Sequence, residues 1–357
     1  MLLDHSKWIG ILGVFPVYKR NLYFCMYIIL RIAMCFCCLV STHVYFKRYL
    51  DNYEMEFGNF FFLKLASIGY ELINYANLLQ VVHFREPGRA LYENIQRLRF
   101  AIRKSNYTRE IAGFYLWIVV FIICVLHGSI GFVYEEWSIS FWAFNAALTY
   151  LQLVGTALLL YDLAVIFTEN NDYLSIRIRR SFASYVRNRF ETQIELDSIV
   201  KCVTRMGEST GLISDFFGIS IFNFVFIAFL ENLFNLNWAL SAMISNTRDI
   251  KDVADVILFA LQILIIIVLN VSSLIMVLSC DKIEAKSNEL LKHCYCLQPD
   301  VKDPILLKQL IDLTDYIKEL KPKMWISGFF RVNKRLIPLM ISTLASYLII
   351  IIQFHKL

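Results

Sequence analysis

The sequence predicts an all-α integral membrane protein with seven transmembrane helices. Of its 357 residues, 58% are hydrophobic and 18% are charged, whereas soluble domains average about 45–50% apolar and about 25% charged residues. The hydrophobic residues gather into long runs with few charges, which are typical of helices that satisfy their own backbone hydrogen bonds in lipid. The basic residues concentrate in alternate connecting segments. The whole chain, 1–357, is therefore interpreted as one membrane domain.

The hydrophobic runs define seven spans in order along the chain. Each reaches the ~17–25 residues that cross about 30 Å of hydrocarbon, and the longer ones are expected to tilt or to extend beyond the membrane. The first run is too long for a signal-peptide core, so it is expected to remain as a helix. The predicted spans are 22–46, 57–83, 113–134, 141–168, 217–244, 255–280 and 336–354.

The distribution of Lys and Arg predicts the orientation of the chain. Of the 35 basic residues, 28 lie in the segments 1–21, 84–112, 169–216 and 281–335. The other set of connecting segments, which alternates with these, holds only 5. Because basic segments stay in the cytosol, the N-terminus is predicted to be cytosolic and the C-terminus extracellular. These basic segments are expected to face anionic lipid, and no recognition module for nucleic acid accompanies them.

The two longest cytosolic segments, 169–216 and 281–335, are predicted to form a helical anchor region. Apolar and basic residues alternate with near-helical spacing over 173–204, without a proline. In the second segment Pro304 suits the first turn of a helix and Pro322 suits its end. Long helices of this kind are expected to pack together beneath the membrane.

Neither an enzyme nor a metal or other cofactor site is predicted. None of the nine cysteines falls in a predicted extracellular loop, so no structural disulfide is expected. His293, Cys294 and Cys296 have the residue types of zinc ligands but lack a second pair at metal-site spacing. The chain also lacks a phosphate-binding glycine loop, a nucleophile elbow and a His pair at helical spacing.

The last hydrophobic run carries a recognisable motif. The run 336–354 is uncharged, and it ends in Ser346-Tyr347, five hydrophobic residues and Gln353-Phe354. This pattern resembles the C-terminal signature of insect gustatory receptors, which is Thr-Tyr, five hydrophobic residues and Gln-Phe. Ser346 replaces the usual threonine and keeps its hydroxyl. Two further segments are similar to that family, 328–333 before the last helix and 8–16 before the first.

The resemblance implies a concrete function. Insect gustatory receptors are ligand-gated, non-selective cation channels in the plasma membrane of sensory neurons, where they detect a small tastant or other chemical cue. They assemble as homo- or heterotetramers of related subunits, with the seventh helix lining a central pore and the ligand bound among helices two to six. The ligand expected by resemblance is a sugar, a bitter compound, carbon dioxide or a pheromone. An insect odorant receptor subunit is the closest alternative.

The resemblance places the pore and its gate on the last helix. An uncharged apolar helix suits a pore that closes by excluding water, and Thr343 shares one helical face with several large side chains nearer the end. The alternative is that this face packs against a neighbouring subunit. Pro338 is expected to kink the helix. The predicted pore and gate residues are Tyr347, Ile350, Ile351, Gln353 and Phe354.

Polar side chains within the other spans are candidates for ligand binding. They are costly in lipid and need a partner or a water-filled cavity. Spans two and four each carry them at helical spacing, which places them on one face. The alternative for each residue is an interhelical hydrogen bond or an ion pair that fixes packing. The predicted ligand-binding residues are Glu71, Asn74, Asn145, Thr149, Gln152, Asn235, Trp238 and Gln262.

Two other classes of membrane protein fit the sequence less well. A G-protein-coupled receptor requires an extracellular N-terminus, which would place 28 basic residues on the wrong side. The end of the third predicted span also lacks an acidic-Arg-aromatic triplet, and the last span lacks an Asn-Pro-x-x-Tyr motif. A secondary transporter is disfavoured because an odd span count fits inverted repeats poorly.

Overall fold

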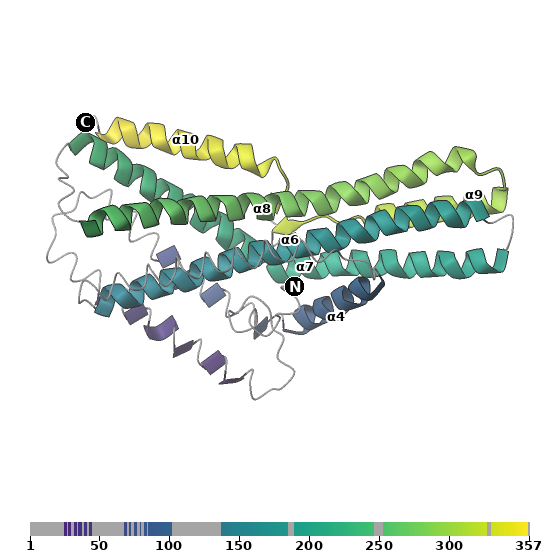
Figure 1. Cartoon of the computed structure of the whole chain (residues 1–357), viewed down its shortest axis with the longest axis horizontal. Coiled ribbons are helices and arrows are strands. Elements are labelled where there is room, and N and C mark those ends of the chain that lie inside the picture. Colours follow the sequence, from purple (N-terminus) through teal and green to yellow (C-terminus); the bar gives the residue numbers. More distant parts are fainter. Residues whose placement is uncertain are drawn as a thin grey trace.

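Six long or medium helices build the described part of the chain in a computed structural model (Figure 1). The structure describes residues 85–101, 137–184, 189–245, 253–326 and 330–355, with helical residues scattered through 25–44 and 68–83. The third predicted span, 113–134, and much of the first two lie outside these residues. The helices are α4 (Arg85–Ala101), α6 (Trp137–Ser184), α7 (Arg189–Ser245), α8 (Val253–Leu297), α9 (Pro304–Glu319) and α10 (Leu336–His355).

Three of these helices are far longer than a membrane is thick. The helices α6, α7 and α8 contain 48, 57 and 45 residues, which corresponds to about 70–85 Å at 1.5 Å per residue. Each continues without a break from a predicted span into an adjoining basic segment. In the described part of the chain, three stretches are long and apolar enough to cross a membrane: Gln152–Phe182, Ile194–Leu233 and Ile263–Asp300.

Buried residues at alternating steps of three and four hold the long helices together. On α6 the stripe runs through Leu153, Ala157, Leu160, Ala164, Phe167, Asn171, Leu174 and Ile178. On α7 it runs through Leu196, Ile199, Val203, Met206, Thr210, Ile213 and Phe217. On α8 it runs through Leu269, Ser273, Met276, Cys280, Ile283, Ser287, Leu290 and Cys294. This spacing is that of a coiled-coil seam, and α8 packs along α6 more extensively than any other described pair.

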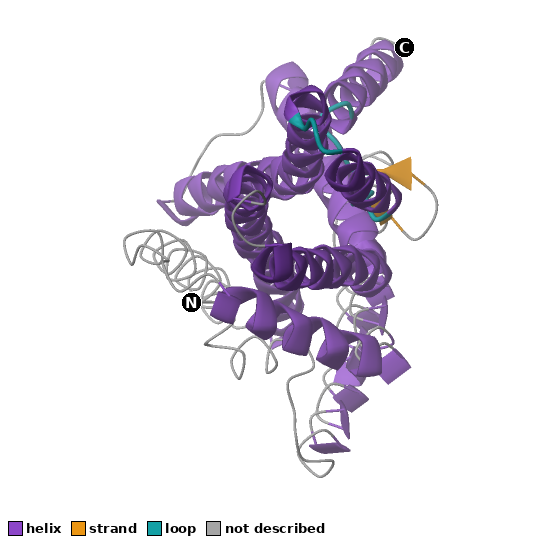
Figure 2. Cartoon of the chain, turned by 90° about the vertical axis from the view of Figure 1, so that its right-hand side faces the viewer, coloured by secondary structure: helices purple, strands orange, loops and turns teal. Residues whose placement is uncertain are grey.

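The bundle is closed by α4 and α9. Viewed from the right-hand end of Figure 1, the helices lie around a common core (Figure 2). Leu91, Ile95 and Leu98 of α4 are buried, and that helix packs mainly on α7. At the start of α9 the Asp303 carboxylate accepts hydrogen bonds from the backbone N–H of Ile305 and Leu306, which caps the helix. The core therefore draws on helices from most of the described chain.

A short antiparallel β-pair interrupts the otherwise helical structure. Strands β1 (Trp325–Ile326) and β2 (Phe330–Arg331) pair Trp325 with Arg331 and Ile326 with Phe330. Within 281–335 a helix ending near Pro322 was predicted, and the β-pair that follows it, where the chain reverses between α9 and α10, was not predicted. Strands of two residues are too short to show a period of two in a sequence. The all-α fold class itself is confirmed by the fold of the whole chain.

Candidate functional site

The C-terminal helix α10 is apolar, and much of its surface is exposed. It runs beside the C-terminal part of α7 and also contacts α8 (Figure 1). Leu339 and Ile341 are each 62% exposed and Ile349 is 57% exposed. Exposed apolar patches of this kind mark surfaces that contact lipid or another protein chain.

Hydroxyl groups on α10 do not make its surface polar. The Thr343 hydroxyl donates to the Leu339 carbonyl at 2.8 Å, and the Ser346 hydroxyl donates to the Ser342 carbonyl at 3.0 Å. Both hydroxyls thus bond to the helix's own backbone, as is common for Ser and Thr in helices. The helix therefore presents an apolar surface although it carries small polar residues.

The predicted pore and gate residues lie along α10. The Tyr347 ring is edge-on to the Phe229 ring of α7, with 5.7 Å between centroids and 74° between planes. Tyr347 and Ile350 are nevertheless partly exposed, and Gln353 is exposed. Ile351 and Phe354 belong to the helix, but their side chains lie outside the description. The contact with Phe229 was not predicted, because nothing in the sequence relates residues so far apart.

The predicted ligand-binding residues divide into three groups. Thr149 and Gln152 are buried along one face of α6, at 0% and 3% exposure, and Thr156 continues that face by donating to the Gln152 carbonyl at 2.9 Å. Glu71 is half-buried. Asn74 lies outside the described residues, as do the side chains of Asn145, Asn235, Trp238 and Gln262. The polar face of α6 therefore points into the protein, which agrees with the high cost of polar groups in lipid.

A reciprocal amide pair joins α7 and α8 within their hydrophobic stretches. Asn232 donates to the side-chain oxygen of Asn270 at 3.1 Å, and Asn270 returns the bond at 3.0 Å. Each amide also donates to a carbonyl one turn earlier in its own helix, that of Ala228 or Ile266. Sequence reasoning missed Asn270, although an asparagine inside an uncharged run is itself a sign of an interhelical partner.

Charged residues fasten the bundle beyond the predicted spans. Lys286 of α8 lies 3.2 Å from the Asp172 carboxylate of α6 and 2.8 Å from Glu289. Arg177 of α6 lies 3.3 Å from the Glu195 carboxylate of α7. These pairs connect α6 to both of its long neighbours.

The cysteine-rich end of α8 contributes to the packing of the core. Cys294 lies beyond the predicted end of the sixth span and is fully buried, and burial raises the pKa of its thiol to about 11. It therefore stays protonated at neutral pH, as is typical of a thiol buried in apolar surroundings. Within the described residues, no group of three or more His, Cys, Asp or Glu side chains is placed to hold a metal ion.

Comparison with known proteins places these features in a family and a fold. Residues 5–357 match the family model described as 7tm chemosensory receptor. The insect olfactory receptor OR5 from Machilis hrabei in complex with eugenol covers 99% of this chain and of its own, with a TM-score of 0.63 at 13% identity. A second structure of OR5 from Machilis hrabei gives a TM-score of 0.57 at 12% identity, with the same coverage. No match is found among curated protein sequences.

Proposed function

Because the chain belongs to the 7tm chemosensory receptor family, we propose that it is a ligand-gated, non-selective cation channel that detects a small chemical cue. The helix α10 carries the proposal. It is a 20-residue apolar helix with much of its surface exposed. Several copies of such a helix around one axis would form an apolar pore that conducts when it is wetted and blocks ions when it dries.

The proposed assembly is a tetramer of this chain or of this chain with related subunits. In such a tetramer, one side of α10 keeps its contact with α7 through Tyr347 and Phe229. The exposed part of the α10 surface, to which Tyr347 and Ile350 contribute, faces the pore axis. The long bundle of α6 to α9 lies outside the pore and supplies the rigid body against which α10 moves.

The C-terminal motif favours a gustatory receptor over an odorant receptor subunit. Ser346-Tyr347 and Gln353-Phe354 stand at the spacing of the gustatory signature. The solved structures with the same fold are olfactory receptors, which keeps an odorant receptor subunit as the second candidate. Both assignments place the chain in the plasma membrane of sensory neurons.

The proposed ligand is a small polar or aromatic molecule held among the second to sixth spans. Thr149 and Gln152 supply a buried polar face on α6, and ligand pockets combine mostly apolar walls with a few polar groups of this kind. The related OR5 was solved with eugenol, which is a small aromatic compound. Sugars, bitter compounds and small aromatics therefore form the first panel to test.

Current recordings test the proposal directly. The full chain is expressed in oocytes, alone and with related subunits, and panel compounds including sucrose, caffeine and eugenol are applied under voltage clamp. We expect at least one compound to evoke an inward current with similar permeability to Na⁺ and K⁺. Oocytes that show the receptor at the surface but respond only through a co-expressed G protein would overturn the channel assignment.

Tagging the two termini tests the proposed orientation. Of the 35 basic residues, 28 lie in the N-terminal segment and in the connecting segments predicted on the same side of the membrane. Because basic segments stay in the cytosol, an epitope at the C-terminus is expected to stain intact cells. An epitope at the N-terminus is expected to stain only after permeabilisation. The reverse pattern would contradict the channel assignment and support a G-protein-coupled receptor.

A further inference from the structure

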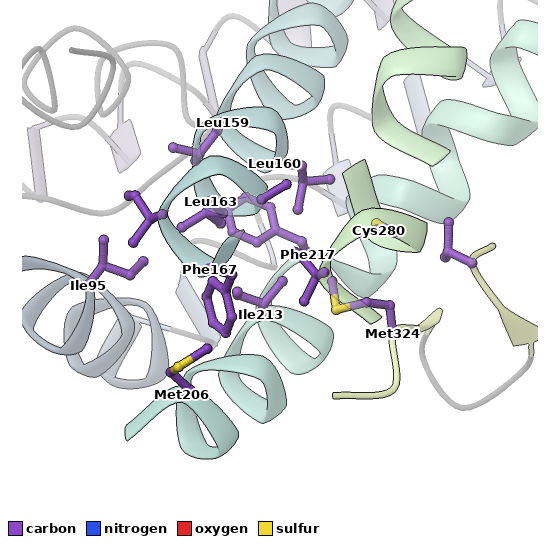
Figure 3. Close-up of a cluster of buried hydrophobic side chains, with 14 of the residues drawn as sticks. Ile95, Leu159, Leu160, Leu163, Phe167, Met206, Ile213, Phe217, Cys280 and Met324 are labelled. Carbon is purple, nitrogen blue, oxygen red and sulfur yellow. The ribbon is translucent and has the colours of Figure 1, made fainter. Parts of the chain in front are cut away.

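The segment between α9 and α10 is fixed firmly to the bundle. Val332 and Met324 are buried, and the Val332 N–H donates to the Met324 carbonyl at 2.9 Å. The Ser214 hydroxyl of α7 donates to the Trp325 carbonyl at 2.7 Å. Figure 3 shows Met324 and Cys280 of α8 in the same cluster of buried hydrophobic side chains. The chain that leads into α10 is therefore part of the core, whereas most of α10 lies outside it.

An ion pair with forked geometry completes this attachment. Arg331 of β2 donates through Nε to Oε2 of Glu284 at 2.8 Å, while its Nη2 contacts the other carboxylate oxygen. Two parallel bonds between a planar guanidinium and a carboxylate restrict both distance and direction. The Glu284 side chain is only 13% exposed, so this pair is less screened than a surface ion pair.

A second carboxylate lies one turn away on the same face of α8. Asp281 accepts a bond of 3.4 Å from the backbone N–H of Lys334, and residues three apart on a helix are neighbours. Leu336, the first residue of α10, is then largely buried, whereas Leu339 is mostly exposed. The start of α10 is thus attached to the bundle, and Tyr347 contacts α7 farther along the helix.

We propose that the Glu284–Arg331 pair is a positioning device that makes the base of α10 move together with α8. This inference rests on the proposed channel function, in which α10 lines the pore. A displacement of α8 caused by ligand is passed to Arg331 through a link that resists both stretching and rotation. The hydrogen bond from Ser214 attaches the same segment to α7. The position of the base of α10 therefore depends on the relative position of α7 and α8.

Hydrogen exchange tests the attachment without requiring any current. In the full chain in nanodiscs, E284Q is expected to speed amide exchange in 330–336 by about ten-fold, because a bond to a charged group is lost. The charge swap E284R/R331E is expected to recover most of the protection. R331K keeps the positive charge but cannot form two parallel bonds, so its exchange rate in 330–336 is expected to lie between those of the wild type and E284Q. It also provides a milder variant if E284Q folds poorly.

The Arg177–Glu195 pair provides a matched control. It also joins two elements beyond the predicted spans and is partly exposed, but it does not touch the segment before α10. E195Q is therefore expected to leave exchange in 330–336 unchanged. Unchanged exchange in E284Q, or an equal increase in E195Q, would overturn the attachment.

Current recordings then test the coupling itself. For a panel compound that opens the wild-type channel, E284Q is expected to raise the concentration for half-maximal current by about ten-fold at matched surface expression. The charge swap is expected to lower it again. Faster exchange with an unchanged midpoint would overturn the coupling. If the wild-type chain passes no current, the channel function fails, whereas the exchange result still decides the attachment.

Discussion

Phe354→Ala is expected to produce a cation current in the absence of added ligand, at surface expression matched to the wild type. In the proposed tetramer, one Phe354 side chain from each subunit narrows the pore near its end. A ring of aromatic side chains excludes water and blocks ions. Alanine leaves a wider and more easily wetted opening, and lowering the barrier by only 1.4 kcal/mol raises the basal current roughly ten-fold. Voltage-clamp recording of basal current in oocytes measures the effect.

Gln353→Ala tests the adjacent position and separates conduction from gating. The Gln353 side chain is exposed, and we expect its amide to coordinate a partly hydrated cation when the channel opens. Its loss is expected to change the relative permeability of Na⁺, K⁺ and Ca²⁺, which reversal potentials report. Ile341→Ala is the control, since Ile341 is exposed but lies on a different helical face from Gln353 and Phe354. If Phe354→Ala and Gln353→Ala both keep the basal current and the permeability ratios of the wild type, the gate is instead expected at Tyr347 or Ile350.

Much of the bundle could be predicted because its helices obey local rules. Apolar runs with few charges mark the apolar parts of α6, α7 and α8, and near-helical spacing over 173–204 marks the extensions of α6 and α7. Pro304 marks the start of α9, with Asp303 before it as a cap. Where the predicted span meets its extension in α6 and α8, the sequence has neither a proline nor a pair of glycines. This agrees with helices that continue unbroken.

The contacts that matter most for the proposed function were beyond sequence reasoning. Phe229 with Tyr347, Asn232 with Asn270 and Arg331 with Glu284 each join elements that are distant in the chain. A sequence read alone shows that a buried polar or charged group needs a partner, but not which residue supplies it. The β-pair before α10 was missed for a different reason, since its strands are too short to give a pattern.

Phe217→Ala is expected to remove most of the folded receptor from the cell surface. Phe217 is fully buried at the level of the bundle where α6, α7 and Met324 meet (Figure 3). Its ring lies edge-on to that of Phe216, with centroids 4.8 Å apart. Replacing a buried phenylalanine by alanine costs about 3–5 kcal/mol through lost contacts and the cavity left behind. That is a large part of the about 5–15 kcal/mol that stabilises a typical folded domain.

The same helix offers a control that isolates burial from residue type. Phe222 is 43% exposed, and its ring stacks on that of Phe226, at 6.2 Å between centroids. Phe222→Ala is expected to keep surface staining and melting temperature close to wild type, whereas Phe217→Ala is expected to lower the melting temperature on the order of 10 °C. Fluorescence-detected size exclusion after heating measures both. Equal decreases in melting temperature in the two variants would mean that the buried stripe of α7 does not form the core. In that case lipid and protein would contact both rings alike. A loss confined to Phe217→Ala is the result expected if packing between helices, rather than apolar surface alone, stabilises the bundle.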